Sequence, residues 1–100
     1  MDFRVDWSTD AAEELRLIWE YIARDSPNRA ATVISKIVDA TDDLALFPLI
    51  GREVPEWQIP DIRERIVYSY RVIYHLYPER AIVVAIVHGA RQLPDSIKDR

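Results

Sequence analysis

The chain contains no cysteine, only two glycines and only two lysines among its 100 residues. The absence of cysteine excludes a disulfide framework, a thiolate metal site and a cysteine nucleophile. The two histidines, His75 and His88, have no partner at metal-ligand spacing, so we expect neither a metal site nor a cofactor. The formal net charge is −4. This balance argues against a broad, phosphate-driven nucleic-acid surface, because such a surface has to be net basic.

Long apolar runs are also missing, and none approaches the length of a membrane-spanning helix. The first six residues alternate charged with apolar side chains and lack the positive-then-apolar order of a signal peptide. We therefore expect a cytoplasmic chain with no membrane partner. With 49% hydrophobic residues, residues 1–100 suffice for one small domain with a packed core and leave no room for a second.

The first half of the sequence predicts a strand followed by two helices. Apolar and charged residues alternate over residues 3–7, as in a strand buried on one face. Apolar residues then recur at three- and four-residue spacing, which predicts a helix over about residues 9–24, with Trp19 in its core-facing stripe. The Ser-Pro pair at 26–27 starts a second helix, because serine caps well and proline suits the first helical position. The proline at position 48 ends that helix.

The second half predicts a long loop and then three strands. Three prolines and Gly51 rule out regular structure between residues 48 and 60. Residues 62–69, 70–77 and 81–88 have the composition of strands, and the last is apolar enough to be a central strand covered on both faces. The expected fold is α+β: an N-terminal strand, an antiparallel helical hairpin and a three-stranded antiparallel meander. We expect an antiparallel sheet with both helices on one face.

Four short segments carry a resemblance to a known family. They are FPLIGREVPE (residues 47–56), IRE (62–64), YRVIY (70–74) and VHGAR (87–91). Their order, on elements of the expected types, resembles the ParE/RelE superfamily of toxins from bacterial type II toxin–antitoxin pairs. The resemblance extends over essentially the whole chain. It implies a growth-inhibiting toxin that a tightly bound cognate antitoxin neutralises.

The superfamily contains two mechanisms, and the chain is closer to one of them. RelE-like members cut messenger RNA in the ribosome with arginines, lysines and an aromatic or histidine near the C-terminus, whereas ParE-like members poison DNA gyrase without known catalysis. By motif, Arg71 and Arg91 match the RelE-like catalytic arginines. The terminal aromatic is missing, with Ile97 in its place, and the lysine cluster is absent. Because arginines alone supply neither proton acceptor nor donor, the resemblance favours a ParE-like toxin that targets gyrase.

Two alternatives stay open at this point. The first is a ribosome-dependent mRNA endoribonuclease, in which Arg71, Arg91 and His88 would be catalytic. The second is a non-toxic, toxin-like domain that only binds partners. Outside the ribonuclease alternative the protein would be a target-poisoning inhibitor and not an enzyme. We expect no direct sequence-specific nucleic-acid binding by the toxin alone.

Four residues are candidates for contact with the target: Arg91, Arg71, Arg52 and Trp57. Arg71 and Arg91 could meet at the strand ends and form a cationic site. Alternatively, each could pair with a carboxylate such as Glu53, Glu56 or Glu64. Trp57 is expected either beneath its loop or at the surface facing a partner, and His88 is expected as a hydrogen-bonded residue where its strand ends.

Two further expectations concern the antitoxin and the end of the chain. Leu17 and Tyr21 lie outside the apolar stripe of the first helix at 100° per residue. Because antitoxins of this family wrap across the helical hairpin, the resemblance makes these two residues antitoxin contacts. From about Pro94 onward the chain is polar except for Ile97, so ordering it gains little apolar contact. We expect this tail to be flexible and to be ordered by a partner.

Overall fold

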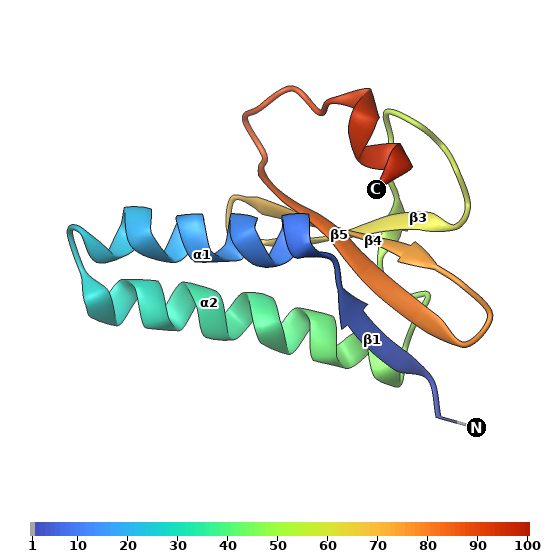
Figure 1. Cartoon of the computed structure of the whole chain (residues 1–100), viewed down its shortest axis with the longest axis horizontal. Helices are drawn as coiled ribbons and strands as arrows, with labels where there is room; N and C mark the ends of the chain where they lie inside the picture. The colour runs from blue at the N-terminus through green and yellow to red at the C-terminus, as the bar shows by residue number, and fades with distance from the viewer. Residues whose placement is uncertain (1) are drawn as a thin grey trace.

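A strand, a helical hairpin and a strand meander follow one another along residues 2–100, the part of the chain described by the computed structural model (Figure 1). The predicted α+β class is confirmed. The elements are β1 (Arg4–Trp7), α1 (Thr9–Ala23), α2 (Pro27–Asp42), the 3-10 helix η1 (Asp43–Ala45), β2 (Arg52–Glu53), β3 (Ile62–Val67), β4 (Tyr70–Leu76), β5 (Arg80–His88) and the 3-10 helix η2 (Asp95–Asp99).

The five strands form one mixed sheet in the order β1-β5-β4-β3-β2. The meander β3-β4-β5 is antiparallel as predicted, because tight turns connect its strands. β1 instead runs parallel to β5, so the expectation of an antiparallel sheet throughout is wrong. Both helices and the strands β2, β3 and β4 lie between β1 and β5 along the chain, and a connection of that length allows a parallel pair. β2 also corrects the prediction that residues 48–60 lack regular structure, since Arg52 and Glu53 pair with β3.

Serine caps start both helices where the sequence predicts. The Ser8 hydroxyl accepts a hydrogen bond from the Ala11 N–H, and the Ser26 hydroxyl accepts one from the Arg29 N–H. The placement of Trp19 in the core is wrong, because its side chain is 45% exposed. The apolar residues of α1 that pack against the core lie on one narrower stripe: Ala11, Leu15, Ile18 and Ile22. Trp19 lies about 100° from Ile18, outside the surface that α2 and the sheet cover.

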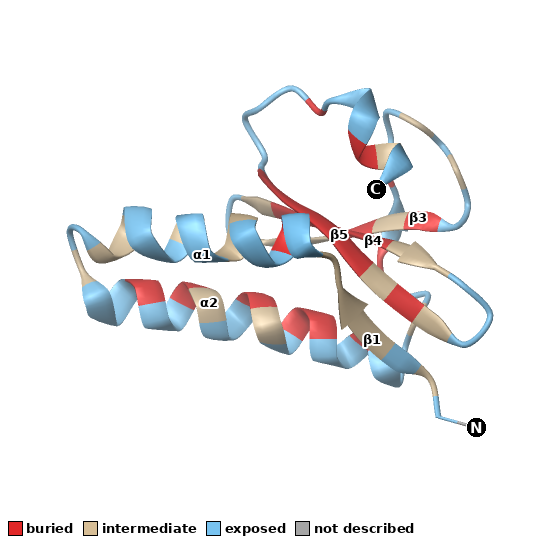
Figure 2. Cartoon of the chain, viewed as in Figure 1, coloured by how far each residue is buried: buried red, intermediate tan, exposed pale blue. Residues whose placement is uncertain are grey.

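Both faces of the sheet are covered, and β5 is an inner strand, between β1 and β4, whose residues are mostly buried (Figure 2). The helical hairpin packs on one face, where Val33 and Ile37 of α2 meet Val83 and Ile86 of β5. The loop between β2 and β3 covers the other face together with η2, whose Ile97 packs with the sheet. The prediction of a β5 strand buried from both sides is confirmed.

The end of the chain packs against the rest of the fold, whereas the sequence predicts a flexible tail from about Pro94. Residues 95–99 form η2, and Leu93 and Ile97 are both buried against the sheet. The Arg100 guanidinium donates to the Glu14 carboxylate at 3.0 Å and to the Val84 carbonyl at 3.0 Å. The C-terminal segment is mostly polar in composition, but the burial of Ile97 and the hydrogen bonds of Arg100 attach it to the rest of the fold.

Candidate functional site

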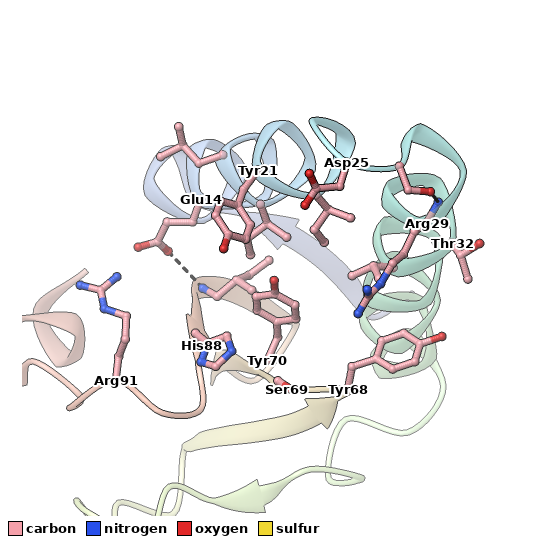
Figure 3. A pocket seen from close by; sticks show the side chains of 16 residues that line it. Glu14, Tyr21, Asp25, Arg29, Thr32, Tyr68, Ser69, Tyr70, His88 and Arg91 are labelled. Atoms are coloured by element: carbon pink, nitrogen blue, oxygen red, sulfur yellow. Dashed lines mark hydrogen bonds between the residues drawn. The ribbon is translucent and has the colours of Figure 1, made fainter.

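A groove of about 930 Å³ lies between the helical hairpin and the exit of β5 (Figure 3). α1, the start of α2, the β3–β4 turn and the end of β5 all contribute side chains to it. Its apolar and aromatic lining consists of Leu17, Ile18, Tyr21, Ile22, Val33, Tyr68, Tyr70 and Ile86. Charged groups stand around this lining, with Glu14 and Arg91 near one end and Arg29 near the other.

Leu17 and Tyr21 lie on the groove side of α1, away from the core. Their side chains are 50% and 71% exposed, which confirms that they lie off the buried stripe. Both line the groove, as do Tyr68 and His88 from the sheet. The sequence thus identified the helix contribution to this surface. It missed Arg29 and Tyr68, because nothing in a linear pattern shows that the α2 start and the β3–β4 turn converge.

A bulge in β5 decides which of its side chains face the groove. Ile73 pairs with Ala85 and Tyr74 pairs with Val83, so Val84 is the extra residue without a partner on β4. An extra residue shifts the two-residue alternation of a strand by one. Beyond the bulge, Ile86 faces the helices and lines the groove, whereas Val87 faces the opposite core. The Ile86 N–H at this edge donates to the Glu14 carboxylate at 3.0 Å.

The β3–β4 turn holds Tyr68 in an unfavourable backbone conformation at the groove. Tyr68 and Ser69 connect the two strands, and Tyr68 has a φ of 52°. A two-residue hairpin turn requires positive φ, which glycine or asparagine adopts at lower cost than a tyrosine. The tyrosine side chain is nevertheless 59% exposed, so it gains little burial in return. A strained, exposed aromatic residue at the rim of a groove is typical of a functional contact.

Arg91 and His88 lie next to each other on the groove. Within residues 2–100 the Arg91 side chain makes no hydrogen bond or salt bridge to another side chain, and it is exposed. The His88 Nδ1 accepts a hydrogen bond from the Ala90 N–H at 3.2 Å, and its ring meets Tyr70 edge to face at 5.6 Å between centroids. His88 therefore is hydrogen-bonded where β5 ends, as the sequence predicts.

Arg71 lies on the other face of the sheet and is fully engaged by carboxylates. Its Nε donates to Glu64 at 2.7 Å, and its two terminal nitrogens donate to Glu56 at 2.6 and 2.7 Å. The guanidinium is only 10% exposed. Between the two alternatives for Arg71, the structure shows pairing with Glu56 and Glu64. The bidentate Arg71 pair holds the pKa of Glu56 at about 2, well below its ordinary value.

Glu64 is the centre of this network and is fully buried. It accepts from Arg71 on one oxygen and from Arg52 on the other, at 2.7 and 2.9 Å. The Arg52 side chain is itself 62% exposed, so one end of the network reaches the surface. The sequence named Glu64 among the possible carboxylate partners of Arg71, but it did not predict that Glu64 is buried or that it also binds Arg52.

The structure does not bring Arg71 and Arg91 together in one hollow. Arg91 lines the groove beside the helices, whereas Arg71 lines a second hollow of about 570 Å³ with Arg52, Glu56 and His88. Opposite faces of the sheet separate the two guanidinium groups, because Arg71 contacts Glu56 of the covering loop and Arg91 faces α1. Of the two alternatives from the sequence, the structure therefore shows the carboxylate pairing of Arg71 and not a joint cationic site of Arg71 and Arg91.

The sequence left two places open for Trp57, beneath its loop or at the surface, and the structure shows a partly buried side chain that combines both. Its ring is half-buried against the core of the loop face, and its Nε1 donates to the Asp95 carboxylate at 3.0 Å. The Lys98 ammonium lies 5.7 Å from the ring centroid. Trp57 thus joins the β2–β3 loop to η2 while part of the ring stays accessible.

Metal ligands and membrane spans are absent among residues 2–100. No group of three or more His, Asp or Glu side chains there could hold a metal ion. None of the helices described in these residues is long and apolar enough to cross a membrane. Besides its apolar lining, the groove contains two arginines, Arg29 and Arg91, and two carboxylates, Glu14 and Asp25.

Comparison with known proteins agrees with this geometry. Residues 5–93 match the family described as ParE toxin of type II toxin-antitoxin system, parDE. The chain belongs to the ParE toxin family. A protein named Putative toxin Y4kP from Sinorhizobium fredii (strain NBRC 101917 / NGR234) is 30% identical over 92 residues, which are 91% of this chain and 93% of that protein. ParE toxins of type II systems are paired with an antitoxin, so the family implies a cognate antitoxin partner.

A solved structure shares the ParE fold of this chain. It is the chromosomal ParDE TA system from P. aeruginosa, which superposes with a TM-score of 0.71 at 18% identity. The match covers 86% of this chain and 95% of the other chain. At this identity the likeness concerns the fold. The ParE-like resemblance seen in the sequence segments is confirmed by the family match.

Proposed function

We propose that this ParE-family toxin inhibits growth by poisoning DNA gyrase in the cytoplasm and is neutralised when its antitoxin occupies the groove beside α1. The observation that carries the proposal is the engagement of Arg71. In the RelE-like ribonucleases a matching arginine serves phosphate chemistry. In this chain all three guanidinium nitrogens of Arg71 donate hydrogen bonds to Glu56 or Glu64. A guanidinium bound to two carboxylates has little positive charge left for a phosphate.

The remaining ribonuclease candidates do not compensate for this loss. His88 faces the groove next to Arg91, but its Nδ1 is occupied by the Ala90 N–H, and the carboxylates that line the same groove are Glu14 and, near the far end beside Arg29, Asp25. The Glu14 carboxylate is itself held by Arg100 and by the Ile86 N–H. RNA cleavage needs a proton acceptor and a proton donor on opposite sides of the reacting phosphate. A protein-binding toxin fits these contacts better.

The groove supports the antitoxin part of the proposal. Its lining of Leu17, Tyr21 and Tyr70 offers the apolar and aromatic anchors that dominate protein interfaces, and Arg29 and Arg91 stand at opposite ends. An amphipathic segment with acidic side chains would complement this surface. An antitoxin segment in the groove would also cover Arg91, so neutralisation would follow from burying a target contact.

For the target we propose direct contacts from Arg91, Arg52 and Trp57. Each retains an exposed part, whereas Arg71 acts by holding Glu56 and the loop that carries Trp57. Arg71 is therefore a positioning residue and not a contact. Its replacement should weaken the toxin through disorder of the loop.

The test compares the two mechanisms with purified protein. The toxin is expected to inhibit supercoiling by purified gyrase or to trap cleaved DNA, and to leave mRNA on programmed ribosomes intact. Arg91→Ala should lower inhibition by about 10- to 100-fold, since hydrogen bonds to charged groups contribute about 1.5–3 kcal/mol. Lys36→Ala, a change on the outer side of α2, is the matched control for loss of one charge. Codon-specific mRNA cleavage that Arg91→Ala abolishes would contradict the proposal and support the ribonuclease alternative.

A further inference from the structure

An exposed apolar turn lies between η1 and β2, outside the groove. Its four large side chains, Leu46, Phe47, Leu49 and Ile50, are 78%, 60%, 66% and 46% exposed. We call residues 46–50 the apolar turn. Single exposed apolar side chains are common, but four in five consecutive residues are a patch, and such patches mark interaction surfaces.

The backbone of the apolar turn is fixed from below. The buried Tyr74 hydroxyl donates to the Pro48 carbonyl at 2.9 Å and accepts from the Gly51 N–H at 2.9 Å. The Ile50 N–H donates to the Phe47 carbonyl at 3.1 Å, which closes a β-turn with proline at its second position. The apolar side chains are therefore exposed on a rigid support and not on a loose loop.

Gly51 shows how closely this support is packed. A Cβ added at Gly51 would lie 2.6 Å from the Tyr74 hydroxyl and 2.7 Å from the Glu64 carbonyl, so only glycine fits. Arg63 also donates to the Gly51 carbonyl at 2.9 Å. A preorganised apolar surface loses little entropy when it binds, which is a property of binding anchors.

The charges around the apolar turn identify the kind of partner. Asp39 and Asp42 at the end of α2 are exposed and make no salt bridge within residues 2–100, and no lysine or arginine occurs between positions 37 and 51. Asp43 next to them is paired with Arg65 at 2.8 Å. The α2 side of the turn is therefore net acidic, with three aspartates against Arg65, whereas Arg63 and Arg52 carry positive charge on its β2 side. The acidic side disfavours an anionic membrane or nucleic acid, and in a symmetric pair of chains it would bring like charges together.

We propose that the apolar turn is the anchor through which the toxin binds its protein target, in an apolar cleft bordered by basic side chains. The inference rests on the proposed function and adds a surface to it. The turn lies far from the antitoxin groove: Arg29 near the start of α2 lines the groove, and the turn follows the end of α2, about 20 Å away at 1.5 Å per residue. Arg52 follows the turn directly and extends the same surface.

The test replaces Phe47 and Leu49 together by serine and measures target and antitoxin separately. The double variant should fold with a melting temperature within a few degrees of wild type and bind the cognate antitoxin with unchanged affinity. Its potency against purified gyrase, and its growth inhibition on induction without antitoxin, should fall at least tenfold. Phe47→Leu with Leu49→Phe, which keeps the surface apolar, should retain potency. Trp19→Gln, an exposed aromatic on α1 outside both hollows, is the matched control and should retain it too.

Several results would overturn the inference. They are full potency of the serine variant, a loss of antitoxin affinity that accompanies the loss of potency, and an exchange variant as weak as the serine variant. A wild-type dimer that becomes monomeric in the serine variant would show that the turn binds a second copy. A wild-type protein that neither stops growth nor inhibits gyrase would remove the proposed function and this inference with it. A fully potent serine variant would remove only the inference.

Discussion

At the scale of single residues, Glu64 and Arg71 show that an arginine in a motif linked to catalysis can instead form a buried ion pair. In the sequence, Arg71 resembles a catalytic arginine of RelE-like toxins by its motif, yet its local partners here are two glutamates. A charge buried with matched, hydrogen-bonded partners is tolerated, but removal of one partner is costly. Glu64→Leu should therefore destabilise the protein by about 3 kcal/mol, because it leaves Arg71 buried without one of its two carboxylate partners. Chemical denaturation measures this, and a loss below about 1 kcal/mol would show that Glu56 alone suffices.

Glu56 predicts how stability depends on pH. Its folded pKa of about 2 lies below the ordinary value of 4.5, because Arg71 binds the charged form. A carboxylate with a lowered pKa stabilises the fold above the unfolded pKa, and this stabilisation is lost as pH falls from about 4.5 toward 2. The side chain is 43% exposed, so solvent screening reduces the effect to about 1 kcal/mol.

The experiment is a set of urea titrations between pH 6 and pH 2. Glu56→Gln should be less stable than wild type at pH 6 and should approach wild-type stability near pH 2. Glu53→Gln is the matched control, since Glu53 is exposed and makes no salt bridge in residues 2–100. Equal differences between Glu56→Gln and wild type at both pH values would contradict the assignment.

At the scale of elements, we expect the groove-facing residues of α1 to contribute to antitoxin binding and not to the stability of the core. Leu17→Glu with Tyr21→Glu places two negative charges on exposed positions, so the melting temperature should stay within a few degrees of wild type. Binding of the cognate antitoxin should weaken at least a hundredfold, because two central anchors are lost. Titration calorimetry measures the affinity, with Trp19→Gln as control on the same helix. Unfolding of the double variant would show that these residues support the core.

The same elements show what the sequence could and could not predict. Helix starts were predictable because Ser8 and Ser26 act through local hydrogen bonds. The meander was predictable because alternation and turns are local patterns. The direction of β1 and the pairing of β2 depend on partners far along the chain, which local patterns do not show. The groove was found only in part for the same reason: Leu17 was visible on its helix, whereas Arg29 and Tyr68 come near it only in the fold.

At the scale of the whole molecule, the two faces of the sheet differ, because one carries the groove and the other is closed by a second core. The helix face carries the groove, which offers a partner apolar contact and free charge. The opposite face is closed by the β2–β3 loop and η2, which the network of Glu64 and the hydrogen bond of Trp57 hold together. The strained backbone of Tyr68 is compatible with a stable fold because this second core supplies stability elsewhere.

Changes in the C-terminal tail can test whether the core of the loop face supplies this stability. Ile97 is 2% exposed and packs in the core of the loop face, so Ile97→Ala should cost about 2–3 kcal/mol and lower the melting temperature by on the order of 10 °C. Truncation after Leu93 should destabilise the protein further, because it also removes the partners of Trp57 and Glu14. Ser96→Ala, on the exposed side of η2, is the control and should leave stability within about 0.5 kcal/mol of wild type. A truncated protein with wild-type stability and lower toxicity would mean that the docked tail serves the target and not the fold, because the buried isoleucine would then contribute no net stabilisation.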